Sequence, residues 1–138
     1  SVPVGIEALK RRLSALDDAC DSIGRAPSTV ERTLEIQIMI AEDYDALRET
    51  LRAILSTTPE GEQTPQDDDF IAFMNDDSDT LPDLLTETGL AGTPQDVIDQ
   101  IQTYINLGIS HFMLWFIDAP DDMGMRLFME QVRPAFTR

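Results

Sequence analysis

Lysine, cysteine and histidine are nearly missing from this chain of 138 residues, and each scarcity argues against a class of function. Lys10 is the one lysine beside nine arginines, and 26 acidic side chains bring the net charge to −16. We expect no nucleic-acid partner, because binding to phosphates needs clustered Lys and Arg. With Cys20 and His111 as the one cysteine and the one histidine, no intrachain disulfide is possible and we expect no metal site.

Long apolar runs are missing too. The run Phe112–Ile117 is far shorter than the roughly 20 residues that a membrane-spanning helix needs, so we expect no membrane partner. We find no signal-peptide pattern before the first expected helix and therefore predict a cytoplasmic protein. Aspartate outnumbers glutamate 17 to 9, which together with the scarcity of lysine suits a high-salt cytoplasm. A GC-rich genome produces the same bias toward arginine.

What the sequence does contain is enough apolar residues, 42%, for the core of one domain, arranged in helical and strand patterns. Thr33–Ala41 alternates, with Glu35 and Gln37 on the face opposite the isoleucines, which is typical of a strand with one wetter face. Ile109–Asp118 is an apolar run typical of a strand buried on both faces. Helical stripes with apolar residues three and four apart cover 6–23, 43–55, 93–105 and 121–133. Strands separated by helices are joined by right-handed crossovers, so we predict an α/β protein with two neighbouring parallel strands.

An irregular acidic insertion, residues 56–88, separates the two halves of this pattern. It contains turn formers, two acidic runs, a short apolar patch at 70–74 and one further helical turn at 81–86. We expect residues 56–79 to be exposed and poorly ordered, because they have little to bury. Neither acidic run has the ligand spacing or the glycine turn of a calcium loop.

No free-standing catalytic motif is present: the chain has no G-x-G-x-x-G, P-loop, C-x-x-C or nucleophile elbow. In α/β proteins, sites gather at the carboxyl ends of parallel strands, which here are Met39–Glu42 and Trp115–Asp118. Trp115, with Asp118 nearby, has the residue types that border a planar cofactor; alternatively, Trp115 packs under the last helix. His111 suits a structural role better than a catalytic one.

Two stretches resemble the luciferase-like monooxygenase family. The first runs from Leu16 to Glu31 and contains the pattern L-D-x-x-C-x-x-x-G-R-x-P. The second covers the carboxyl-terminal third, in which the matching residues are Gly92, Thr93, Pro94, Tyr104, Gly108, His111, Phe112, Trp115, Phe116, Phe128, Val132 and Pro134.

This resemblance implies an oxidoreductase with a (β/α)8 barrel that uses FMN or a deazaflavin coenzyme on a small organic substrate, and the first stretch favours the deazaflavin branch. A barrel needs about 250 residues. The resemblance therefore implies that residues 1–138 are the carboxyl-terminal segment of such a barrel, namely its last two parallel strands with their helices.

The resemblance also suggests a role for five residues. Glu35 and Gln37 would face the barrel lumen, Trp115 and Phe116 would form an apolar wall, and Asp118 would lie near the rim. Because a flavin site is assembled from several strand ends, we expect this chain alone to hold no coenzyme and to be inactive.

A second hypothesis is a non-catalytic α/β module that acts through self-association. An incomplete sheet has unpaired backbone groups on its flanks, which favour pairing with another chain. On either hypothesis we predict a homo-oligomer for the chain by itself.

Overall fold

Three parallel strands and their helices make up the structure, a computed structural model that describes residues 5–63, 66–87 and 89–137. The strands are β1 (Thr33–Ile40), β2 (Gly89–Gly92) and β3 (His111–Phe116). The α-helices are α1 (Ile6–Ser22), α2 (Tyr44–Thr57), α3 (Asp68–Met74), α4 (Asp83–Thr86), α5 (Pro94–Asn106) and α6 (Met123–Leu127). Short 3-10 turns lie at Pro27–Thr29, Glu60–Glu62 and Arg133–Ala135, and a π-helical turn at Phe128–Val132.

The strand order is β2-β1-β3, so the first strand lies in the middle of the sheet. β1 and β3 pair in parallel, with Leu34 beside Phe112 and Ile38 beside Phe116, which confirms the predicted pair of neighbouring strands. β2 is a third strand that the sequence pattern did not predict, because its four residues, GLAG, contain two glycines and no alternation. Pairing with the end of β1 makes it a strand.

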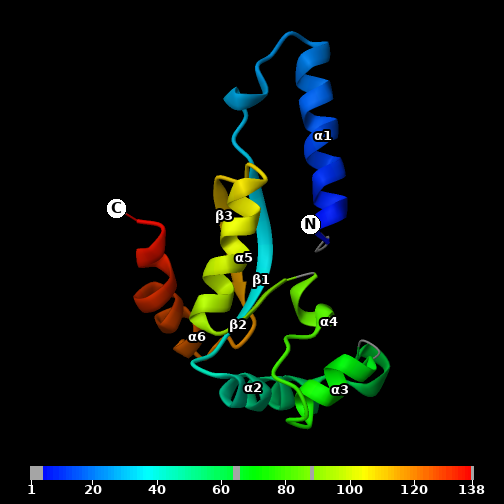
Figure 1. The fold of residues 1–138 in the computed structure, drawn as a ribbon, viewed down its shortest axis with the longest axis vertical. Helices are drawn as coiled ribbons and strands as arrows, with labels where there is room; N and C mark the ends of the chain where they lie inside the picture. Colours follow the sequence, from blue (N-terminus) through cyan, green and yellow to red (C-terminus); the bar gives the residue numbers. More distant parts are fainter. Residues whose placement is uncertain (1–4, 64–65, 88, 138) are drawn as a thin grey trace.

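One face of the sheet is covered by α1, α5 and α6. The isoleucines of β1 pack there against residues of the three helices, in a core with Leu9, Val97, Ile101, Tyr104 and Val132. Figure 1 shows α5 lying along the strands, with α1 on one side of it and α6 on the other. The predicted helices at 6–23 and 93–105 are confirmed, with Gly24 in the left-handed region at φ 71° and a capping box between Thr93 and Asp96.

Among the described residues, α2 and α3 cover the opposite face near the carboxyl ends of the strands. There α2 and α3 lie across the end of the sheet (Figure 1) and form a second core with Met39 and Ala41 of the β1 end. Phe70 and Phe73 of α3 are buried in it. Most of the described residues in 56–79 are exposed, as expected, but the two phenylalanines of the apolar patch are not, because the patch folds as a helix onto α2.

Arg48 of α2 attaches the insertion to the rest of the fold. Its side chain is 2% exposed, and its guanidinium lies 4.5 Å from the centre of the Phe73 ring. It donates hydrogen bonds to the backbone carbonyls of Phe73, at 2.6 Å, and Ser78, at 2.9 Å. Ion pairs of 2.9–3.0 Å join it to three carboxylates, those of Asp45, Asp76 and Asp79.

Two further expectations need correction. β3 is not buried on both faces, because Met113 is 46% and Trp115 61% exposed while the residues between them face the core. The last helix is not continuous over 121–133: α6 has five residues and continues as a π-helical and then a 3-10 turn. Pro134 lies within this 3-10 turn, which spans Arg133–Ala135.

Candidate functional site

Three of the five residues selected from the sequence lie together on one surface of the sheet. The register places Gln37 of β1 beside Trp115 of β3, and Glu35 beside Met113. Side chains of aligned residues on neighbouring strands point to the same face, so these four form one patch, which we call the open sheet face. It belongs to the face opposite α1, α5 and α6, which we call the inner face, and it is the part of that face that α2 and α3 leave uncovered.

Phe116 does not share this surface with Trp115. As successive residues of a strand, the two point to opposite faces. Phe116 packs against the core under the helices, where its ring lies 5.9 Å from that of Phe128 in an edge-to-face contact. The structure thus separates the two aromatic residues that the resemblance grouped as one wall.

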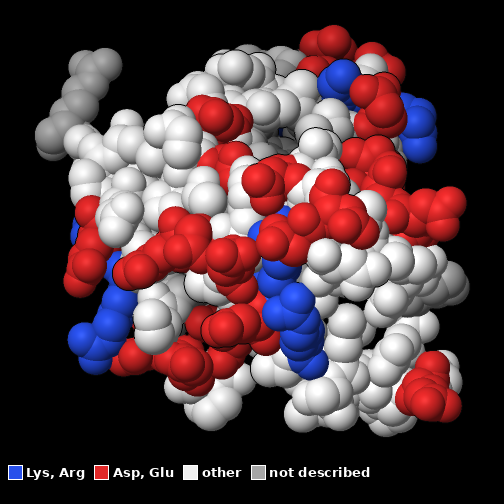
Figure 2. All heavy atoms as spheres, turned by 60° about the horizontal axis from the view of Figure 1, so that its bottom comes forward, with Lys and Arg blue, Asp and Glu red and all other residues white. Residues whose placement is uncertain are grey.

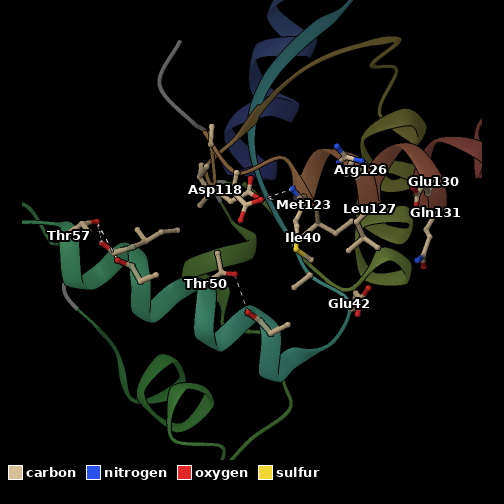
Figure 3. Close-up of a pocket in the computed structure, with 18 residues that line it drawn as sticks. Ile40, Glu42, Thr50, Thr57, Asp118, Met123, Arg126, Leu127, Glu130 and Gln131 are labelled. Atoms are coloured by element: carbon tan, nitrogen blue, oxygen red, sulfur yellow. Dashed lines mark hydrogen bonds between the residues drawn. The ribbon is translucent and has the colours of Figure 1, made fainter.

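Asp118 lies at a second feature, a cavity of about 600 Å³ at the carboxyl ends of β1 and β3. We call it the carboxyl-end cavity. Figure 3 shows α2, with Thr50 and Thr57, on one side and Met123, Arg126 and Leu127 of α6 on the other. The two strand ends form its base through Ile40, Ala41, Glu42, Ile117, Asp118 and Ala119.

Asp118 shapes this cavity through a backbone contact. Its carboxylate accepts a hydrogen bond of 3.0 Å from the N–H of Gly124 in the first turn of α6. A Cβ atom at position 124 would lie 2.7 Å from the Asp118 Oδ2, so a side chain there would displace the carboxylate from this contact. Asp118 therefore fixes where α6 begins relative to β3.

The carboxyl-end cavity is acidic. Glu42, Asp118, Asp121 and Glu130 line it, against the single cation Arg126 among its lining residues. Arg126 is engaged by Asp122 in an ion pair of 2.8 Å, and this carboxylate raises the pKa of the guanidinium. Figure 2, in which the lower end of Figure 1 comes forward, shows Asp and Glu spread across this face with few basic side chains.

A hydrogen-bond network joins the first turns of α2 and α5. One oxygen of Asp96 accepts bonds from the Tyr44 hydroxyl at 2.8 Å and from the Thr93 N–H and hydroxyl at 3.0 and 2.9 Å. Burial and the adjacent Asp96 carboxylate raise the pKa of Tyr44 to about 12. The phenol therefore stays protonated and donating at neutral pH.

Within the described ranges, no group of three or more His, Cys, Asp or Glu side chains is arranged to hold a metal ion. No helix among these residues is long and apolar enough to cross a membrane. His111 is exposed at the start of β3, with its Nδ1 3.7 Å from the carboxylate of Glu31.

The α2 side of the cavity was missed from the sequence. Its lining residues Ala46, Thr50, Ala53 and Thr57 are spaced by four, three and four, so they form one row of small side chains along the helix. That spacing is visible in the sequence, but nothing in it indicates that this row faces a cavity rather than solvent or another helix.

Parallel strands with helices packed outside, an inner face left partly open, and a cavity at the carboxyl ends define part of a (β/α)8-barrel-like fold. Solved structures of that kind are similar to this chain. An F420-dependent secondary alcohol dehydrogenase, in complex with an F420-acetone adduct, matches with a TM-score of 0.64 at 23% sequence identity. The match covers 99% of this chain and 42% of the dehydrogenase.

A coenzyme F420-dependent tetrahydromethanopterin reductase from Methanopyrus kandleri matches with a TM-score of 0.63 at 17% identity, over 93% of this chain and 42% of the reductase. The chain thus spans less than half the length of both proteins. At these identities the likeness establishes the fold. No family model and no curated protein matches the sequence.

Proposed function

We propose that this chain is the carboxyl-terminal part of a deazaflavin-dependent oxidoreductase that acts on a small organic substrate. The observation that carries the proposal is the match of nearly the whole chain to two F420-dependent enzymes, covering the same fraction of each. The resemblance of two sequence stretches to the luciferase-like family also supports the proposal, because it rests on sequence motifs and not on the structural match. A cytoplasmic location belongs to the same proposal.

The open sheet face suits the ring of a deazaflavin. Trp115 and Met113 provide a flat, exposed apolar surface, and the Gln37 amide beside them has both donors and an acceptor for the polar edge of such a ring. The coenzyme supplies hydride transfer, while the protein positions the ring and excludes water from it. In this role Trp115 and Gln37 are binding residues. Glu35 lies two residues before Gln37 on β1, further from the carboxyl end of the strand.

The anionic tail of the coenzyme does not fit the cavity of this chain. Phosphate and carboxylate groups are held by Arg, Lys or unpaired backbone N–H groups. The carboxyl-end cavity has four acidic side chains, and its single arginine is already paired with Asp122. We therefore assign the tail to residues outside this chain, and the same reasoning applies to the phosphate of FMN.

Two measurements test the proposal. The intact mass of the protein and the length of its reading frame should reveal about 150 or more further residues, which with these 138 exceeds the roughly 250 of a barrel. Titration of F420 and FMN should then show F420 binding by the product of the full reading frame, and no tight binding of either by the 138-residue chain. A reading frame limited to these residues, or a full product that does not bind F420, would contradict the proposal.

The variant Trp115→Ala of the full product should weaken F420 binding by about tenfold, since loss of an aromatic contact of 1–1.5 kcal/mol has that effect. Ile23→Ala is the matched control, because Ile23 is also an exposed apolar residue, at the far end of α1. Equal effects of the two substitutions would remove Trp115 from the site.

A further inference from the structure

The two outer edges of the sheet differ in how their backbone groups are satisfied. At the β2 edge, Ala91 points its N–H and C=O away from β1, and the side-chain amide of Gln100 binds both of them. Its oxygen accepts from the Ala91 N–H at 2.9 Å, and its nitrogen donates to the Ala91 carbonyl at 2.7 Å. Gln100 thus takes the place of a neighbouring strand and closes this edge to pairing.

The β3 edge has no such closure. The N–H groups of His111 and Ile117 donate to carbonyls of the β1 side, so the alternate residues Phe112, Leu114 and Phe116 point their backbone groups outward. Among the described residues, the Phe116 carbonyl accepts a hydrogen bond of 3.3 Å from the Ala119 N–H, and no hydrogen bond engages the outward N–H or C=O of Phe112 or Leu114. An edge strand with free groups is a template for pairing with another strand.

This edge is also where a second copy of the chain meets the least charge repulsion. Residues 100–117, which include all of β3, form the longest run in the sequence without Asp, Glu, Lys or Arg. Met113 and Trp115 lie next to the edge as exposed apolar side chains. Elsewhere a net charge of −16 opposes the approach of two identical chains.

We propose that β3 of one 138-residue chain pairs antiparallel with β3 of a second copy, joining two three-stranded sheets into one of six strands. A two-fold axis beside Leu114 makes the contact self-complementary, and the same axis brings Met113 of each copy opposite Trp115 of the other. The closed β2 edge stops growth at the dimer. The inference concerns association of this chain and does not depend on the proposed coenzyme.

The direct test combines sizing with residue-resolved hydrogen exchange at low and high protein concentration. We expect a monomer–dimer equilibrium in which the amide of Leu114, which pairs with Leu114 of the second copy at the axis, becomes protected only as the dimer forms. The amides of Met113 and Trp115 bond to β1 and should be protected at every concentration. Added salt should favour the dimer, because it screens the repulsion. A monomer at all concentrations, or a dimer in which the Leu114 amide stays unprotected, would overturn the proposal.

Two pairs of variants sharpen the test. Leu114→Pro and Leu114→Ala both remove the leucine side chain, but only proline removes the outward N–H, so the proline variant should dimerise at least about tenfold more weakly than the alanine variant. Gln100→Ala should produce species larger than the dimer by opening the second edge, whereas Gln102→Ala on the same helix should not. Equal dimerisation of the two Leu114 variants, or unchanged size after Gln100→Ala, would count against edge pairing.

Discussion

Arg48 shows at the scale of one residue how so acidic a chain keeps a buried cation. Its three carboxylate partners are themselves 71–85% exposed, so they remain hydrated while the guanidinium is buried. The nearby carboxylates raise the pKa of Arg48, and the largest cause is the hydrogen bond that the guanidinium donates to Asp79. The contacts that depend most on Arg48 are the two backbone carbonyls, because the bond to Phe73 is buried and the bond to Ser78 is half-buried.

The variant Arg48→Ala should therefore lower the free energy of unfolding by about 2 kcal/mol, about 1 kcal/mol for each carbonyl that loses its donor. Arg52→Ala is the control, since Arg52 is exposed and donates one bond to the Met74 carbonyl. Its effect should stay within about 0.5 kcal/mol. Urea unfolding of both variants measures the difference, and equal midpoints would show that Arg48 does not anchor the insertion.

Tyr44 provides a prediction about pH. Its pKa is raised from 10.0 to about 12 in the folded chain, so folding favours the protonated phenol. The stabilisation is fully present below pH 10 and is lost as the pH rises from about 10 to about 12. Tyr44→Phe should cost about 0.5–1 kcal/mol at neutral pH and should show a smaller fall in stability over that alkaline range.

Tyr104→Phe is the comparison for this pH profile. Burial raises the pKa of Tyr104 as well, but its hydroxyl has no hydrogen-bond partner among the described residues. This variant should keep the alkaline loss that belongs to Tyr44. Thermal unfolding of the three proteins between pH 7 and about pH 11 measures it, and identical profiles for wild type and Tyr44→Phe would contradict the assignment.

At the scale of elements, the carboxyl end of β2 is the point where three elements meet. Gly92 ends β2, Thr93 caps α5, and Asp96 connects both to Tyr44 of α2. The backbone of Gly92 has φ 129°, a region that side chains rarely adopt. A Cβ there would also lie 2.6 Å from Asp96 Oδ2.

Gly92→Ala should consequently destabilise the chain by about 2 kcal/mol, from backbone strain and from displacement of Asp96. Gly61→Ala should change stability by less than about 0.5 kcal/mol, because position 61 has open space around it. Denaturant midpoints test the pair. A Gly92→Ala variant as stable as the wild type would show that Asp96 can move without loss.

At the scale of the whole molecule, the net charge opposes association of the chain, and the incomplete sheet favours it. The net charge of −16 keeps copies apart, while Met113 and Trp115 are exposed on the open sheet face and, among the described residues, the outward backbone groups of Phe112 and Leu114 at the β3 edge have no hydrogen bond. Addition of the rest of a barrel, or of a second copy, would cover these groups. Added salt shifts this balance toward association, because it weakens the repulsion and leaves the apolar contacts in place.

Stability should therefore rise as NaCl is increased from about 0.1 to about 1 M, over which the screening length falls from about 10 to about 3 Å. The double variant Asp18→Asn, Asp21→Asn carries a net charge of −14 after two acids are removed from −16. It should respond less to salt than the wild type. Equal slopes of the unfolding temperature against salt would indicate that general repulsion is not what limits stability.

Much of the architecture was decided locally and could be predicted. The alternation of Thr33–Ala41 and the three-and-four spacing of the helices bury one face whatever packs against it, so β1, β3, α1, α2 and α5 follow from the sequence. Caps such as Thr93 and the turn at Gly24 depend on neighbouring residues in the chain, and they too were predictable. The polar face of Glu35 and Gln37 belongs to the same local information.

Only the tertiary structure decided the rest, because those features depend on contacts between distant segments. GLAG is a strand since it meets the end of β1, and Phe73 and Arg48 are buried since α3 folds back onto α2. The register that places Trp115 beside Gln37 is set by the pairing of two segments about 80 residues apart. The cavity at Asp118 likewise exists because α2 and α6 arrive at the same strand ends. No periodicity within a single segment contains that information.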